Sequence, residues 1–335
     1  MKTRKLVLII ADFILLAVLT AQCVLISRDG SKTFRLKETP DEIIIQKGSE
    51  NVILKYENNN WFVGEKKYPA NISSVDSILE SLESIRCIDK VGSVSKPNAA
   101  DKYELNEGQK ISVIARKEGT DLRSIDIGKN GSTGSQSFIT VDGGKDIYLA
   151  TGGLRYDFDT SIDQIRSKIV WDFDEAEINA VEVIKTENIT RGNIEDDDSW
   201  SSGDSFKVAK NSSDNNTQWV IYGADNSEID IEPDGEKIQS WFDGLGSLTT
   251  SLWYDESKDL EKEFNSRKIA TVNITHGFDI ASIDIYEIPV DMEDDSTESG
   301  KTPSYYGKTS ENPYPFELTS YTMERLNKNP EELAK

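Results

Sequence analysis

The first 26 residues constrain this chain most, because they hold a nearly unbroken apolar run, Leu6–Ile26, behind a short basic tail. About 20 consecutive apolar residues are enough to cross a bilayer as a helix. The run therefore predicts a transmembrane signal anchor over residues 6–26, with residues 1–5 as a cytoplasmic tail. It places the rest of the chain outside the cytoplasm, at the cell membrane, as a single-pass protein.

A cleaved signal peptide and a lipoprotein signal are the alternatives to this anchor. A cleaved signal peptide has an apolar core of about 7–15 residues and small residues before the cleavage site. Here the core is longer, and Leu19 stands where a small residue is needed ahead of Ala21. A lipoprotein site would use Cys23, but Gln22 precedes it. The length of the run favours the uncleaved anchor and leaves both alternatives open.

One carboxylate interrupts the apolar run. Asp12 in mid-membrane costs about 3 kcal/mol, whereas each Leu, Ile, Val or Phe contributes about 0.3–0.6 kcal/mol towards insertion, so the run still favours insertion. Asp12 is therefore a candidate contact with a polar group on a neighbouring membrane helix. The alternative is that Asp12 lies near Lys5 at the membrane interface.

Net charge argues against one class of partner, and cysteine content argues against an internal disulfide. The formal net charge is −22, and a field of this sign repels phosphate backbones, which argues against nucleic-acid binding. Cys23 lies in the apolar run and Cys87 in the polar part, so no internal disulfide is expected.

The polar part of the chain repeats itself. Ser124–Ile127 and Ser282–Ile285 have the same four-residue sequence, and an Ile, a Gly and an Asp precede both segments at the same spacing. Trp61 has a counterpart in Trp219, and both are expected in the core. This repeat predicts a tether over residues 27–40, a first lobe over residues 41–174 and a duplicated second lobe over residues 175–335.

Each lobe is expected to be α+β, with short, mainly antiparallel strands and one or two helices. Alternating apolar residues separated by Gly and Asn turns indicate the strands. Apolar residues at helical spacing predict helices over Ser74–Ile85 and Asp234–Leu245. Ser73 and Asp76 fit a capping box at the start of the first of these.

Catalytic motifs are missing from the sequence. His276 is the single histidine and stands beside Gly277, where an exposed turn is expected. No CxxC, HExxH or GxxxxGK[ST] pattern occurs, so redox, zinc-protease and nucleotide chemistry lack their residues. The sequence therefore predicts no catalytic, cofactor-binding or metal-binding residue.

Among possible metal sites, a calcium loop is the one that the sequence resembles most, although the match is incomplete. Asp230, Glu232, Asp234 and Gly235 imitate the opening of an EF-hand loop, but Trp241 occupies the twelfth position, where a bidentate Glu is required. An acidic helix start is the simpler interpretation.

The residues together resemble a known family. The apolar segment, Asn60-Trp61, the Ser74–Ile85 helix, Tyr103-Glu104-Leu105 and the strand pair within Ile111–Ile127 are similar to the bacterial domain of unknown function 4340. Members accompany ABC-transporter permeases and the auxiliary subunits of gliding-motility type. The resemblance implies an accessory role beside such a transporter, with a permease or auxiliary subunit as partner, and it carries over no catalytic residue.

Three functions are consistent with these observations. The first is a membrane-anchored, extracytoplasmic, non-enzymatic accessory protein that binds a protein or envelope polymer. The second is a ligand-binding module with a solute in the cleft between the lobes. The third is an envelope glycan hydrolase that uses paired carboxylates, Asp121 with Asp126 or Asp279 with Asp284.

Overall fold

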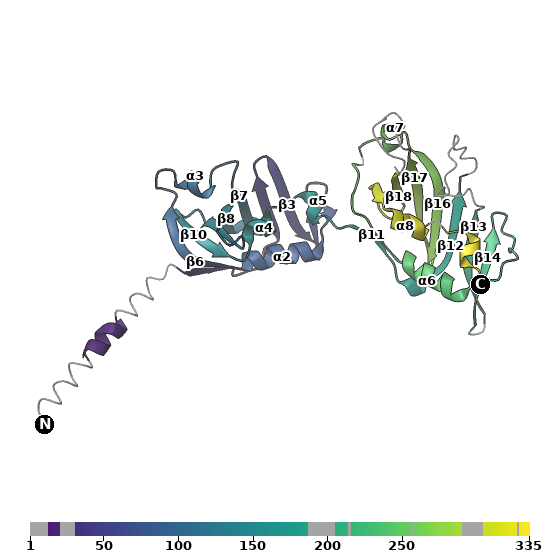
Figure 1. Cartoon of the computed structure of the whole chain (residues 1–335), viewed down its shortest axis with the longest axis horizontal. Coiled ribbons are helices and arrows are strands. Elements are labelled where there is room, and N and C mark those ends of the chain that lie inside the picture. The colour runs from purple at the N-terminus through teal and green to yellow at the C-terminus, as the bar shows by residue number, and fades with distance from the viewer. Residues whose placement is uncertain are drawn as a thin grey trace, which may run out of the picture. The chain divides into compact units, whose positions relative to one another are not determined.

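The computed structural model describes residues 13–20, 31–186, 205–213, 216–255, 257–289, 304–326 and 328–335. The chain divides into two compact units, Met1–Ser167 (unit 1) and Lys168–Lys335 (unit 2), each of which has its own sheet (Figure 1). The first unit thus ends at Ser167, whereas the sequence placed the end of the first lobe at residue 174.

The prediction of an N-terminal transmembrane helix is wrong. Of the apolar run, the structure describes residues 13–20, which are helical. Among the described residues, no helix has the length and apolar character needed to cross a membrane.

Unit 1 is built around one ten-stranded antiparallel sheet. Its strand order is β1-β6-β10-β9-β8-β7-β2-β3-β4-β5. The strands are β1 (Lys32–Arg35), β2 (Glu42–Lys47), β3 (Glu50–Glu57), β4 (Asn60–Val63), β5 (Tyr68–Pro69), β6 (Ser84–Ser93), β7 (Ile111–Lys117), β8 (Thr120–Asn130), β9 (Gln136–Val141) and β10 (Asp146–Thr151).

Helix α2 (Ile72–Glu83) covers the apolar face of this sheet (Figure 1). Its buried residues Val75, Ile78 and Leu82 recur at helical spacing and join the sheet's inward side chains in one core. The helix begins earlier than predicted, because Asn71 and not Ser73 is its N-cap, accepting a hydrogen bond from Ser74 N at 3.0 Å. Besides the helical residues 13–20, the described part of unit 1 contains the helices α3 (Ala99–Tyr103), α4 (Leu154–Phe158) and α5 (Ile162–Ile165).

Unit 2 contains a seven-stranded antiparallel sheet with the order β14-β13-β12-β16-β17-β18-β19. Its strands are β12 (Ile178–Lys185), β13 (Phe206–Ser213), β14 (Asn216–Gly223), β16 (Arg267–His276), β17 (Asp279–Ile288), β18 (Ser304–Thr309) and β19 (Phe316–Leu318). A second, two-stranded sheet pairs β11 (Ile169–Asp172) with β15 (Ser247–Thr249). The helices are α6 (Gly235–Leu245), α7 (Leu260–Glu263) and α8 (Ser320–Leu326), with 3₁₀ turns at Glu175–Glu177 and Pro330–Leu333.

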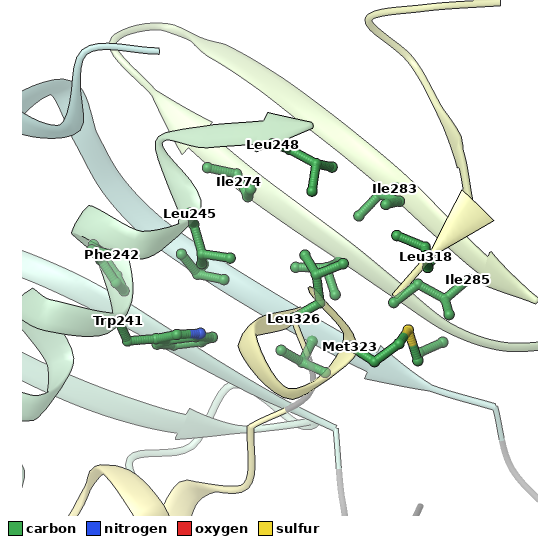
Figure 2. Close-up of a cluster of buried hydrophobic side chains, with 14 of the residues drawn as sticks. Trp241, Phe242, Leu245, Leu248, Ile274, Ile283, Ile285, Leu318, Met323 and Leu326 are labelled. Carbon is green, nitrogen blue, oxygen red and sulfur yellow. The ribbon is translucent and has the colours of Figure 1, made fainter. Parts of the chain in front are cut away.

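The core of unit 2 lies between its large sheet and helices α6 and α8 (Figure 2). Phe242 of α6 and Leu326 of α8 are buried in the same cluster as Ile274 of β16 and Ile283 of β17. The polar edge of Trp241 is satisfied inside this core, because its indole N–H donates to the carbonyl oxygen of residue 325 at 2.7 Å. A buried aromatic with its single donor paired adds area to the core without leaving an unmet hydrogen bond.

The two tryptophans expected in the core lie there to different degrees. Trp61 of β4 is buried, with 8% of its surface exposed, which confirms the prediction for that residue. Trp219 of β14 is half-buried and packs edge-on against Phe242, with ring centroids 4.9 Å apart. Trp219 therefore contacts the core from its margin.

The predicted fold class also needs correction in its proportions. Of the described residues, 46% lie in strands and 23% in helices, and the sheets are antiparallel. Several strands are long: β8, β16 and β17 have 11, 10 and 10 residues. Short helical segments such as α3 and α7 add to the one or two helices expected in each lobe, because a single turn is too short to show helical periodicity.

Two phenylalanines of unit 2 give a matched test of this core. Phe242 is 1% exposed, whereas Phe278 is fully exposed. We expect Phe242→Ala to lower the free energy of unfolding of unit 2 by about 3–5 kcal/mol through the cavity it leaves. Phe278→Ala should change it by less than about 0.5 kcal/mol. Urea unfolding followed by circular dichroism measures both, and equal effects would contradict the packing described.

Candidate functional site

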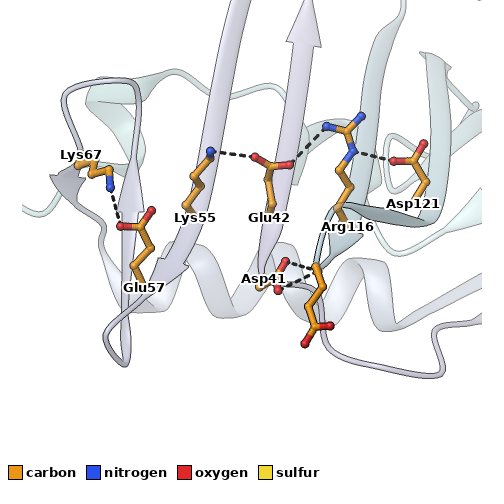
Figure 3. A network of polar contacts seen from close by, with 8 residues as sticks. Asp41, Glu42, Lys55, Glu57, Lys67, Arg116 and Asp121 are labelled. Carbon is orange, nitrogen blue, oxygen red and sulfur yellow. Dashed lines mark hydrogen bonds and ion pairs between the residues drawn. The ribbon is translucent and has the colours of Figure 1, made fainter.

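The first carboxylate pair proposed for glycan hydrolysis lies on a single strand. Asp121 and Asp126 both belong to β8. The Arg116 guanidinium on the neighbouring strand β7 donates to Asp121 at 2.6 Å, and it also lies 3.4 Å from Glu42 of β2 (Figure 3). Asp121 is thus part of a row of ion pairs across three strands, on a surface where such pairs add modest stability.

Asp126 and Asp284 occupy matching places in two hairpins. Each carboxylate accepts a hydrogen bond from a hydroxyl on the strand before it, from Ser112 at 2.7 Å and from Thr271 at 2.8 Å. A lysine also pairs with each carboxylate, 3.3 Å away for the first and 2.6 Å for the second: Lys110 and Lys268. Both copies of the repeated Ser-Ile-Asp-Ile segment therefore use their aspartate to join two strands.

Asp279, the fourth of these carboxylates, opens β17 opposite His276 at the end of β16. The prediction that His276 lies in an exposed turn is wrong. The imidazole is half-buried and stacks on Phe173, with ring centroids 4.0 Å apart. The turn follows at Gly277, whose φ of 56° is in the left-handed region that favours glycine. His276 therefore packs beside the turn of the β16–β17 hairpin.

The acidic segment that imitates a calcium loop begins a helix. Asp234 is the N-cap of α6 and accepts hydrogen bonds from Glu236 N at 3.1 Å and Lys237 N at 3.2 Å. These backbone N–H groups, with Lys237 first, hold the pKa of the Asp234 carboxyl below its usual range. Trp241 is buried in the core. The interpretation as an acidic helix start is confirmed.

Other candidate groups are structural or lie outside the described residues. Within the described part of the chain, no three His, Cys, Asp or Glu side chains gather closely enough to hold a metal ion. Burial raises the pKa of the Cys87 thiol to about 11, which keeps it protonated and unreactive. Asp12, the predicted membrane-helix contact, is outside the described residues.

The structure brings forward two features that the sequence predictions missed. The first is the tip of the β16–β17 hairpin, where Phe278 is fully exposed and Ile280 is largely exposed. A comparison of the two copies of the repeat could have revealed this tip. The first copy has the polar Thr120 at the position where the second copy has Phe278. An apolar residue thus replaces a polar one at the same turn.

The second feature is a cleft in unit 1 between α2 and the segment that runs from α4 to α5. Its volume is about 530 Å³, within the range of about 300–1,000 Å³ of small-molecule sites. The side chains that line it are mostly polar and come from three separate stretches of chain: Ser74, Ser77, Ile78, Asn130, Arg155, Tyr156, Asp157, Asp159, Thr160, Gln164 and Ile165. No periodicity joins these stretches, so the cleft has no sequence signature.

Comparison with known proteins gives one finding. The family model described as Domain of unknown function (DUF4340) matches residues 61–265, which begin in unit 1 and end in unit 2. No curated protein and no solved structure matches the chain.

The N-cap of α6 yields a pH-dependent prediction. Because the pKa of folded Asp234 is lowered, its contribution to stability is present above the ordinary carboxyl pKa and is lost as the pH falls through the folded value. We expect Asp234→Ala to lower the melting temperature at pH 7, and the difference from the wild type to shrink below about pH 4.

Asp234→Asn is the control, because asparagine also accepts the cap hydrogen bonds. It should lose less than the alanine variant at pH 7. A difference between wild type and Asp234→Ala that stays constant from pH 7 to pH 3 in thermal melts would contradict this account.

Proposed function

Because the chain belongs to the DUF4340 family, we propose that it is a non-catalytic binding protein that works outside the cytoplasm as an accessory to an ABC-type transporter. Its partner in this proposal is a permease or auxiliary subunit of the transporter, as in a gliding-motility-type system. The observation that carries the proposal is the apolar tip of the β16–β17 hairpin, because it offers an anchor for a protein partner.

The tip consists of Phe278 and Ile280 (the hairpin tip). Phe278 is fully exposed, and burying such a side chain in a partner contributes about 2 kcal/mol. Aromatic anchors of this kind provide much of the binding energy at protein interfaces.

The residue that precedes the turn of the hairpin is fixed to the core by stacked rings. His276 stacks on Phe173 at 4.0 Å, and Phe173 stacks in turn on the buried Trp171 at 5.6 Å. The backbone N–H of Gly277 also donates to the carbonyl oxygen of Glu177 at 2.9 Å. An exposed aromatic on a rigid support loses little conformational entropy when it binds.

Acidic groups flank the hairpin tip. Asp279 is the next residue after Phe278, and the exposed Glu177 lies beside Gly277. The carboxylates repel anionic lipid headgroups and attract cationic side chains, so they favour a protein surface over a membrane. The partner we propose has an apolar pocket with a rim of Lys or Arg.

Envelope glycan hydrolysis is the weaker alternative, because the carboxylates that it would need are engaged in contacts within the fold. Asp121, Asp126 and Asp284 each have an ion-pair partner, and the last two also accept hydrogen bonds from hydroxyl groups. The carboxylates of a glycosidase have to flank the scissile bond, whereas these carboxylates are engaged in contacts within the sheet. These contacts support structural roles. The other alternative, a solute bound in the cleft between the lobes, stays a prediction, because the cleft described above lies within unit 1.

Co-purification tests the partner. We expect the tagged chain, isolated from detergent-solubilised membranes of its own cell, to bring down an ABC permease or auxiliary subunit. Phe278→Asp should reduce this recovery about tenfold or more, since it removes the anchor and adds charge. The matched control is Thr120→Asp at the equivalent turn of unit 1. Recovery of the chain alone, or equal recovery with Phe278→Asp, would refute the proposal.

Cysteine labelling tests the location. In a Cys23→Ala background, the remaining Cys87 is buried with a raised pKa and should react slowly. In the variant Thr120→Cys, the new thiol lies at an exposed position. It should react with a membrane-impermeant maleimide in spheroplasts before lysis. Labelling that requires detergent lysis would place unit 1 inside the cell and contradict the proposal.

A further inference from the structure

The cleft of unit 1 has an apolar floor and polar walls. The buried side chains of Ile78 in α2 and Ile165 in α5 form the floor. Hydroxyl, amide and charged groups form the walls. A ligand that fits such a cleft has an apolar face for the floor and polar groups along its edges, because unpaired polar groups buried by a ligand lose their hydration.

The charged groups of the cleft already have partners within unit 1. The Arg155 guanidinium donates to two backbone carbonyl oxygens, at 2.6 and 3.5 Å. Asp157 accepts a hydrogen bond from Ser81 Oγ at 2.6 Å, and Asp159 pairs with Lys47. A charged ligand would have to compete with these contacts, so the cleft favours an uncharged one.

The uncharged groups keep hydrogen-bonding capacity. Asn130 and Gln164 each use the side-chain oxygen within the fold, accepting from Ser137 Oγ at 3.3 Å and from Ser161 N at 2.9 Å. Their amide N–H groups make no hydrogen bond within the described part of the chain, and both side chains line the cleft. Ser77 donates to a backbone carbonyl at 3.0 Å, which leaves its oxygen able to accept. These groups match the alternating donors and acceptors of hydroxyls.

An aromatic ring completes the site. Tyr156 lines the cleft and is 88% exposed, so its ring contributes little to the core of unit 1. An exposed aromatic face packs well against the C–H face of a sugar ring, which is apolar while its edge carries hydroxyls. We propose that the cleft between α2 and α4–α5 binds a neutral, hydroxyl-rich saccharide. Its volume of about 530 Å³ has room for a disaccharide. This site is independent of the transporter partner proposed above.

Isothermal titration calorimetry of the full chain tests the site, with maltose, cellobiose and di-N-acetylchitobiose as neutral probes and inorganic phosphate as a charged one. We expect saturable binding of at least one neutral disaccharide, and no binding of phosphate at the same concentrations. The melting temperature should rise with that disaccharide, since a ligand that binds the folded state stabilises it.

Two variants locate the binding. Tyr156→Ala should weaken it about threefold to tenfold by removing the ring. Ser77→Leu should abolish binding, because the larger side chain would fill the cleft from the exposed side of α2. Leucine is also a good helix former, so α2 should remain folded. Tyr321→Ala in unit 2, where the ring is also largely exposed, is the matched control and should bind as the wild type does.

Each result decides the proposal. Loss of binding in Ser77→Leu with unchanged thermal stability, together with weakening in Tyr156→Ala, supports it. Absence of binding by all three neutral probes at tens of millimolar would overturn it. Equal affinity in wild type, Tyr156→Ala and Ser77→Leu, or binding of phosphate in preference to the disaccharides, would overturn it as well.

Discussion

The structure of each unit depends on antiparallel pairing between long strands with one apolar face. In unit 2, Val272 and Ile274 of β16 and Ile283 and Ile285 of β17 alternate with polar residues and are buried. Alternation with a period of two gives the sheet one face that must be covered. Helices α6 and α8 provide the cover in unit 2, and α2 does so in unit 1. The hairpins therefore fix both the cores and the positions of the loops.

Several of the acidic residues lie on the polar faces of these hairpins. Asp126 and Asp284 join neighbouring strands through a hydroxyl and a lysine, and Asp121 joins a row of ion pairs through Arg116 (Figure 3). Such contacts between neighbouring strands tie the carboxylates to the sheet. We propose recognition at two other places, the hairpin tip and the cleft of unit 1.

The sequence predicted much of the sheet but less of its detail. It located the strand pairs around Ser124–Ile127 and Ser282–Ile285, since alternation over several residues is a strong local signal. It misplaced the start of α2, because Asn71 and Ser73 are both good caps and only packing decides between them. It also mistook the environment of His276, whose partner Phe173 lies a hundred residues away in the chain.

The sequence by itself determined the acidic surface, the alternating strands, the acidic start of α6 and the lack of known catalytic motifs, because these are properties of composition and short-range spacing. The tertiary structure decided the rest. It brings Ile78, Asn130 and Tyr156 to one cleft, and it leaves Phe278 exposed while Phe242 is buried. Both outcomes follow from contacts between residues far apart in the chain, and neither residue type nor local spacing records such contacts.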